Sequence, residues 1–228
     1  MNEFIKYWDE ELVEQHVGQD IGYATNYFKS LNVDTISYID IGANVGKIYD
    51  CLKKSFTIEK CIMVEANKNL SDYIKEKYKN EPNIEIHNLG ITEQNGKFKV
   101  HAAGFENLSD FNRSINLGLS RVEKEEGDTE CVTMDYFLRN INTIAPNKIS
   151  LIKIDTETKD YIILRDMMNW LAENKIQPYI LFENNFYFCM TKEEAQKILN
   201  DFCSLCNYEP VNVETLPGDS LLKPIIHS

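Results

Sequence analysis

The sequence predicts an α/β fold with a mostly parallel central sheet and helices on both faces. Short apolar runs alternate with amphipathic segments from residue 36 to residue 206, as in chains that alternate strands with helices. The first run ends abruptly at glycine, and turn residues near the C-terminus predict an antiparallel hairpin there. Strands that alternate with helices form parallel sheets with right-handed crossovers. We therefore expect one α/β domain over residues 1–228.

Composition narrows the classes of function. The 228 residues carry 24 Lys and Arg against 36 Asp and Glu, a net charge of −12 that disfavours nucleic acid as a partner. No apolar run approaches the roughly 20 residues of a membrane span, and the N-terminus lacks a signal-peptide pattern. The cysteines lie in apolar surroundings, which favours reduced, buried thiols. We expect a cytoplasmic protein without membrane insertion.

Residues 1–33 contain aromatic and aliphatic side chains at irregular spacings of three to four, which predicts one or two amphipathic helices. We interpret this range as an N-terminal helical cover over part of the site. A helix packed on an exposed face of the sheet is the alternative.

The first strand is expected over residues 36–41, and it ends in a turn bracketed by Gly42 and Gly46 before a helix over 45–55. Glycine lets a ligand and the neighbouring strand approach the backbone closely, and Asn44 tolerates a left-handed conformation. We expect the turn to present bare backbone N–H groups. The spacing G-x-x-x-G lacks the middle glycine of a pyrophosphate-binding loop, so an adenosine ligand without phosphates fits better.

A second apolar run over 58–65 ends in Glu65, nineteen residues after Gly46. This interval is close to the one at which a nucleotide-binding βαβ unit places an acid on the ribose hydroxyls. A helix over 70–78 and a third strand over 84–89 follow. Asn88, at the end of that strand, is a candidate for contact with an adenine ring, and a turn-forming Asn is the alternative.

The pattern then changes, because Asn95-Gly96 followed by alternating apolar residues predicts a tight hairpin. An antiparallel element is therefore inserted after the third strand. Residues 103–130 are polar and rich in hydrogen-bonding side chains, which suits a variable acceptor pocket. His101 could reach such a pocket, although a structural role in its strand is the alternative.

The remaining elements complete the alternation. A short strand runs into a helix near 130–138 with Thr133 or Asp135 at its cap, and a fourth strand over 149–154 ends in an acidic segment. Open α/β sheets bind ligands at the carboxyl ends of their strands, although acids are also common in a first helical turn. A helix over 162–171, a strand over 179–182, a helix over 192–206 and a hairpin around 217–219 follow.

Five segments resemble, in order and spacing, the FkbM-type S-adenosylmethionine-dependent methyltransferases. The resemblance covers roughly residues 36–186 and implies a Rossmann-like methyltransferase fold. It also implies S-adenosyl-L-methionine as cofactor, S-adenosyl-L-homocysteine as product, and methylation of a hydroxyl on a small molecule or saccharide. The segments are 38–46 (YIDIGANVG), 64–67 (VEAN), 88–91 (NLGI), 132–138 (VTMDYFL) and 151–157 (LIKIDTE).

By this resemblance the glycine turn surrounds the methionine part of the cofactor, Glu65 holds the ribose, and Asn88 lies near the adenine. The expected cofactor contacts are Asp40, Gly42, Ala43, Asn44, Gly46, Glu65, Ala66, Asn88, Leu89 and Asp155. Two residues depart from the family pattern. Thr158 stands where the family has glycine, and Ala66 stands where it has proline.

Transfer to a hydroxyl requires a positioned base, for which Asp155 and Glu157 are the first candidates and His101 the next. We expect no metal, although a divalent ion held by Asp155, Glu157 and Glu183 could do the same work. The expected acceptor contacts are Arg113, Ser114, Thr158, Glu183 and Asn184.

The favoured acceptor is a saccharide or a nucleotide-sugar-derived molecule of surface-polysaccharide or natural-product biosynthesis, methylated on oxygen, with an amine or amide nitrogen as the alternative. Three other functions stay open at this stage. A nicotinamide-dependent oxidoreductase shares the βαβ unit and the acid, and a catalytically inactive cofactor-binding protein would fit Thr158. RNA methylation is disfavoured by charge. A homodimer is compatible with the sequence.

Overall fold

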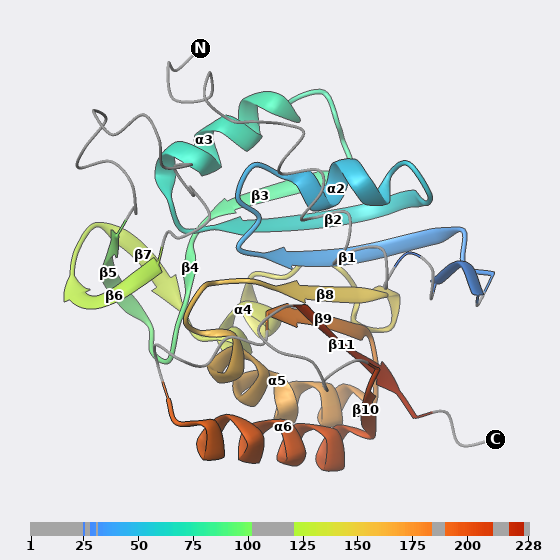
Figure 1. The fold of residues 1–228 in the computed structure, drawn as a ribbon. Helices are drawn as coiled ribbons and strands as arrows, with labels where there is room; N and C mark the ends of the chain where they lie inside the picture. Colours follow the sequence, from blue (N-terminus) through green and yellow to red (C-terminus); the bar gives the residue numbers. More distant parts are fainter. Residues whose placement is uncertain are drawn as a thin grey trace, which may run out of the picture.

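A computed structural model describes residues 25, 28–30, 32–101, 121–183, 190–211 and 219–225. Its centre is a seven-stranded sheet with the order β10-β11-β9-β8-β1-β2-β3 (Figure 1). Five neighbouring strands run parallel, and two C-terminal strands run antiparallel at one edge. The parallel strands are β1 (Thr35–Ile41), β2 (Thr57–Glu65), β3 (Ile84–Asn88), β8 (Leu151–Ile154) and β9 (Tyr179–Glu183). The antiparallel pair is β10 (Tyr208–Pro210) and β11 (Asp219–Pro224).

Helices cover both faces of this sheet (Figure 1). On one face lie α2 (Lys47–Leu52) and α3 (Lys68–Lys77), and on the other lie α4 (Met134–Asn140), α5 (Asp160–Asn174) and α6 (Lys192–Cys206). Successive residues of β1 alternate between the two cores: Tyr38 packs with α2 and α3, and Ile39 packs with the other helices. Burial on both faces explains why the strand sequences are almost continuously apolar. The predicted fold is confirmed.

A second, four-stranded sheet lies beside the first, with the order β4-β7-β5-β6. The inserted antiparallel element is confirmed, but the tight hairpin predicted at Asn95-Gly96 is wrong. β7 lies between β4 and β5, and the Asn95 side chain instead accepts a hydrogen bond of 2.8 Å from the Thr133 backbone N–H. The strands are β4 (Gly90–Ile91), β5 (Gly96–His101), β6 (Arg121–Glu126) and β7 (Thr129–Val132).

Side-chain caps begin three of the helices. The Thr133 hydroxyl accepts from Tyr136 N at the start of α4, as one of the two predicted cap residues. Thr191 and Glu194 form a capping box before α6, and Asn67 caps α3. A 3-10 turn, Pro146–Lys148, precedes β8.

Most of the predicted helical cover over residues 1–33 lies outside the described residues. Within it, Phe28 is buried, and its ring packs edge-on against Tyr179 with centroids 4.8 Å apart. Among the helices that the structure describes, none combines the length and the apolar character needed to cross a bilayer.

Candidate functional site

The turn after β1 is built on three residues with left-handed backbones. The φ angle is 78° at Gly42, 51° at Asn44 and 76° at Gly46. Asn44 therefore adopts the left-handed conformation that its side chain was expected to tolerate. A Cβ added to Gly42 would lie 1.8 Å from the carbonyl oxygen of Asp155. A Cβ on Gly46 would lie 2.5 Å from the Tyr78 ring. Glycine is therefore required at both ends of the turn.

The expectation that this turn presents bare N–H groups is wrong for most of its length. The N–H groups of Gly42 and Ala43 both donate to the carbonyl of Val64, and Gly46 N–H donates to the carbonyl of Ala43. Asn44 N–H donates to the Glu65 carboxylate at 2.8 Å. The turn closes against the end of β2, a contact between segments that the turn's own sequence does not show. It offers no cradle for a pyrophosphate.

Glu65 ends β2 and is only 6% exposed. One carboxylate oxygen accepts from Asn44 N–H and the other from Asn67 N–H, each at 2.8 Å. Burial raises the pKa of Glu65 to about 7, against the opposing effect of the two N–H donors. The carboxyl is thus held firmly at the strand end while its charge is poorly solvated.

Asn88 fixes the same strand end from β3. Its amide nitrogen donates to the backbone carbonyls of Glu65 and Ala66, at 2.9 and 3.0 Å. The N–H of Leu89 donates to the Glu65 carbonyl as well. Asn88 does not line the pocket described below, whereas Leu89 and Ala66 do. The structure gives Asn88 a bracing position, and its contact with an adenine stays a prediction.

The segment after β8 is ordered by its own side chains. The carboxylate of Asp160, the first residue of α5, accepts from both the N–H and the hydroxyl of Thr156, each at 3.2 Å. Glu157 takes a left-handed backbone with φ of 66°, and Thr158 is buried. Thr158 is not among the described residues with positive φ, so a glycine is not needed there for backbone conformation.

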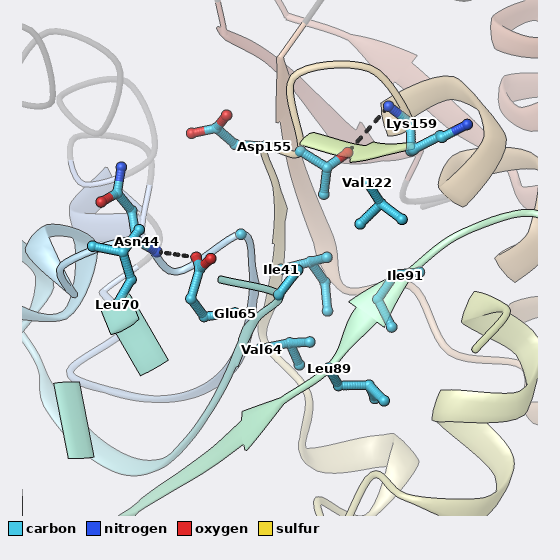
Figure 2. Close-up of a pocket in the computed structure, with 13 residues that line it drawn as sticks. Ile41, Asn44, Val64, Glu65, Leu70, Leu89, Ile91, Val122, Asp155 and Lys159 are labelled. Atoms are coloured by element: carbon cyan, nitrogen blue, oxygen red, sulfur yellow. Dashed lines mark hydrogen bonds between the residues drawn. The ribbon is translucent and has the colours of Figure 1, made fainter. Parts of the chain in front are cut away.

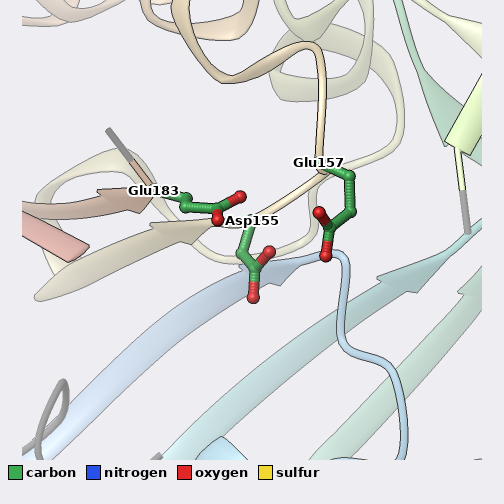
Figure 3. Close-up of side chains that lie close together, drawn as sticks. All are labelled: Asp155, Glu157 and Glu183. Atoms are coloured by element: carbon green, nitrogen blue, oxygen red, sulfur yellow. The ribbon is translucent and has the colours of Figure 1, made fainter. Parts of the chain in front are cut away.

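Three carboxylates converge at this end of the sheet (Figure 3). Asp155, Glu157 and Glu183 each place one oxygen within 4.8 Å of the others. Asp155 and Glu183 meet because Ile154 and Phe182, the residues before them, are partners in the β8–β9 ladder. Burial, and then the charges of Glu183 and Asp155, raise the pKa of Glu157 to about 8. Such a group can accept and release a proton near neutral pH.

A pocket lies between the glycine turn, Glu65 and Asp155 (Figure 2). Its walls combine aliphatic side chains with a few polar groups, as ligand pockets do. The oxygen of the Asn44 side chain is buried and has no hydrogen-bond partner among the described residues, so it can accept from a ligand. The lining residues are Ile41, Gly42, Asn44, Val64, Glu65, Ala66, Leu70, Leu89, Ile91, Val122, Asp155, Thr156 and Lys159.

Three residues at or beneath this pocket were missed by the sequence analysis. Lys153 lies buried beneath the turn, where it pairs with Asp40 and Asp155. Lys159 pairs with Glu93 at 2.9 Å and so ties the start of α5 to the end of β4. Val122 reaches the pocket from β6. Only Lys153 carried a signal, because a lysine inside an apolar strand needs a buried partner.

Some predicted residues are not brought to the pocket. His101 pairs with Arg121 across the β5–β6 ladder, so it lies on the face opposite to Val122, and its Nδ1 is 3.7 Å from Glu123. His101 does not line the pocket that the structure describes, and its role as a base stays a prediction; a sequence cannot show which face a strand residue takes. Asp40 is fully buried beneath the turn rather than in the pocket wall. Arg113, Ser114 and Asn184 lie outside the described residues.

The seven-stranded sheet, with the pocket at the carboxyl ends of its parallel strands, has the Rossmann-like fold of the S-adenosylmethionine-dependent methyltransferases. A family model described as the methyltransferase FkbM domain matches residues 40–217. The chain belongs to the FkbM methyltransferase family. Membership implies S-adenosylmethionine as the cofactor.

Solved structures agree on the fold. An FkbM methyltransferase from Methylobacillus flagellatus KT is 15% identical with a TM-score of 0.51, over 84% of this chain and 44% of that one. The present chain thus spans less than half of that protein. The methyltransferase domain of bacterial CtHen1-CN is 13% identical with a TM-score of 0.50, over 92% and 100% of the two chains. No curated protein matches the sequence.

Proposed function

We propose that the protein transfers a methyl group from S-adenosylmethionine to a hydroxyl of a small saccharide-type acceptor. One observation carries the proposal: Asp155 belongs both to the wall of the nucleoside-type pocket and to the cluster of three carboxylates. A cofactor site and a set of proton acceptors therefore adjoin at a single residue. Methyl transfer to a hydroxyl needs both.

The residues of the pocket fit the cofactor. Glu65 and the unpartnered Asn44 oxygen supply acceptors for ribose and amino N–H or O–H groups, and aliphatic residues such as Leu89 supply a surface for a purine. Asp155 places negative charge where a cationic ligand would lie. When bound, the cofactor supplies a methyl group on a positively charged sulfur.

On the acceptor side, Glu157 is assigned as the base. Its raised pKa, about 8, makes its ionised form a stronger base than an ordinary carboxylate toward a hydroxyl brought within hydrogen-bond distance. Burial, and then the negative charges of Glu183 and Asp155 beside it, favour its protonated form. We assign Glu183 and Thr158, with Arg113, Ser114 and Asn184 from the sequence, to the acceptor's binding site.

A saccharide or nucleotide-sugar-derived acceptor is supported by the family resemblance and by the polar sequence between 103 and 121. The nicotinamide alternative is disfavoured, because the N–H groups of the turn are already bonded and leave no place for a pyrophosphate. The alternative of a catalytically inactive cofactor-binding protein rested on the side chain that Thr158 adds where the family has glycine, and the transfer assay tests it.

The test is an assay of methyl transfer from labelled S-adenosylmethionine to a panel of free hexoses, UDP-hexoses and the corresponding amino sugars. We expect methyl transfer to the hexoses and UDP-hexoses that carry hydroxyl groups and no amine. We expect EDTA to leave the rate of transfer unchanged. Glu157→Gln should lower turnover at least a hundredfold and leave cofactor affinity within about threefold. Glu173→Gln, which alters an exposed carboxylate at the far end of α5, is the matched control.

Three outcomes would contradict the proposal. Transfer to no member of the panel would remove the acceptor class, and transfer to amino sugars alone would assign nitrogen as the acceptor atom. Loss of activity in EDTA that Mg²⁺ restores would assign a metal to Asp155, Glu157 and Glu183, whose spacing would allow it.

A further inference from the structure

Lys153 is a buried lysine in the middle of an otherwise apolar strand. Its side chain is 5% exposed, and its neighbours Ile152 and Ile154 are fully buried. In the parallel β1–β8 ladder, Lys153 is the partner of Asp40, so both side chains emerge on the same face of the sheet. A lysine ammonium is almost never buried unless it is paired, so its contacts show what it does.

The described contacts of this ammonium include three acceptors, which come from three different segments. Nζ donates to the carbonyl of Gly42 at 2.8 Å. It also lies 3.2 Å from a carboxylate oxygen of Asp40 and 3.2 Å from one of Asp155. An ammonium carries three N–H donors. Lys153 thus connects strand β1, the glycine turn and the acidic segment after β8.

Neutralising Asp40 would require only one of these contacts. The other two reach the groups that line the pocket, Gly42 on one side and Asp155 on the other. These two segments also meet backbone to backbone, because Asp155 N–H donates to the carbonyl of Ile41 at 3.0 Å. The ammonium therefore adds a second link at the junction of the two halves of the site, from the Gly42 carbonyl to the Asp155 carboxylate.

We propose that Lys153 is a positioning residue that fixes the glycine turn relative to the Asp155 carboxylate, and so sets the geometry between cofactor and acceptor. This inference rests on the proposed function, which assigns the two sides of the site. Lys153 touches neither cofactor nor acceptor in this account. The competing explanation is that Lys153 serves only as the buried counter-ion of Asp40.

A double-variant comparison separates the two explanations. Lys153→Met keeps a long side chain but removes the ammonium. Asp40 is then buried without a counter-ion, which can prevent folding. The comparison is therefore made between Asp40→Asn and the double variant Asp40→Asn/Lys153→Met, since neither leaves an unpaired charge at position 40. Stability is measured by urea unfolding, and affinity by calorimetry with S-adenosylhomocysteine.

If Lys153 positions the site, the double variant unfolds at a urea concentration close to that of Asp40→Asn but binds S-adenosylhomocysteine at least tenfold more weakly.

Equal affinity in Asp40→Asn and the double variant would overturn the positioning role and leave Lys153 as a counter-ion. Failure of the wild-type chain to bind S-adenosylhomocysteine would instead overturn the proposed function, and with it this assignment. The two failures are thus distinguishable.

Discussion

Glu65 combines two strong backbone hydrogen bonds with a pKa of about 7, because burial outweighs the N–H donors. The folded-state pKa lies above the ordinary value of 4.5, so ionisation favours the unfolded chain. The stabilising contribution of protonated Glu65 is fully present below pH 4.5 and is lost as the pH rises to about 7. A ligand that hydrogen-bonds to the ionised carboxylate would oppose that loss.

The affinity for S-adenosylhomocysteine should therefore depend on pH through Glu65. If hydroxyl groups of the ligand donate to the ionised form, affinity should tighten about tenfold between pH 6 and pH 8. Glu65→Gln cannot ionise, so its weaker affinity should change less over the same range. Calorimetry at the two pH values measures the difference. An equal pH dependence in both proteins would contradict the role of Glu65.

Gly42 is the residue at which the turn tolerates no side chain. Gly42→Ala would place a Cβ 1.8 Å from the Asp155 carbonyl oxygen at a φ of 78°, and should lower the free energy of unfolding by at least about 2 kcal/mol. Gly127→Ala is a matched control, because its Cβ would lie 2.5 Å from the backbone nitrogen of Lys99, away from the pocket. Only Gly42→Ala should also abolish binding of S-adenosylhomocysteine by the folded fraction; loss of binding in both variants would contradict this.

Single residues also show what the sequence can reveal. The left-handed Asn44 and the cap residue Thr133 were predictable, because each follows from a local preference of its side chain. The partners of Lys153 and the orientation of His101 were not. They depend on strand register, which sets the partners and the face of a residue and which no local pattern encodes.

At the scale of elements, the segment between β8 and α5 holds strain at the acceptor side. Glu157 has a left-handed backbone, which costs a residue with a Cβ about 1 kcal/mol or more. Strain of this kind is concentrated at functional sites. Hydrogen bonds from Thr156 to Asp160 hold the segment in place.

Replacing Glu157 should therefore separate stability from function. Glu157→Gly should raise the free energy of unfolding by about 1 kcal/mol over Glu157→Gln, because both variants remove the carboxylate but only glycine relieves the backbone. Both should lose methyl transfer. Urea unfolding and the transfer assay measure the two effects. If the Glu157→Gly protein is no more stable than the Glu157→Gln protein, the segment is unstrained.

The elements differ in how well the sequence predicts them. The parallel strands were found because burial on both faces makes them continuously apolar, as in β1 and β8. The tight hairpin at Asn95-Gly96 was wrong, because β7 enters between β4 and β5 from a distant part of the chain. Local turn chemistry favours a bend at that position, and long-range pairing decides which strands it joins.

At the scale of the whole molecule, the strand order brings the polar strand ends together. β2, β1, β8 and β9 are neighbours, so Glu65, the glycine turn, Asp155 and Glu183 follow one another along a single edge of the sheet. That adjacency was inferred from the alternation of strands and helices, since ligands bind at the carboxyl ends of parallel strands. The convergence of three carboxylates within 4.8 Å required the structure.

The most direct test of the account is calorimetric titration of the purified chain with S-adenosylhomocysteine and, separately, with NAD⁺. We predict binding of S-adenosylhomocysteine and none of NAD⁺. Glu65→Ala should weaken that binding between about tenfold and a hundredfold, as expected for loss of hydrogen bonds to a charged group. The control is Glu85→Ala, which removes a carboxylate on β3 that pairs with Lys60. This variant should not weaken the binding of S-adenosylhomocysteine. Binding of NAD⁺, or S-adenosylhomocysteine binding indifferent to Glu65, would contradict the assignment of the pocket.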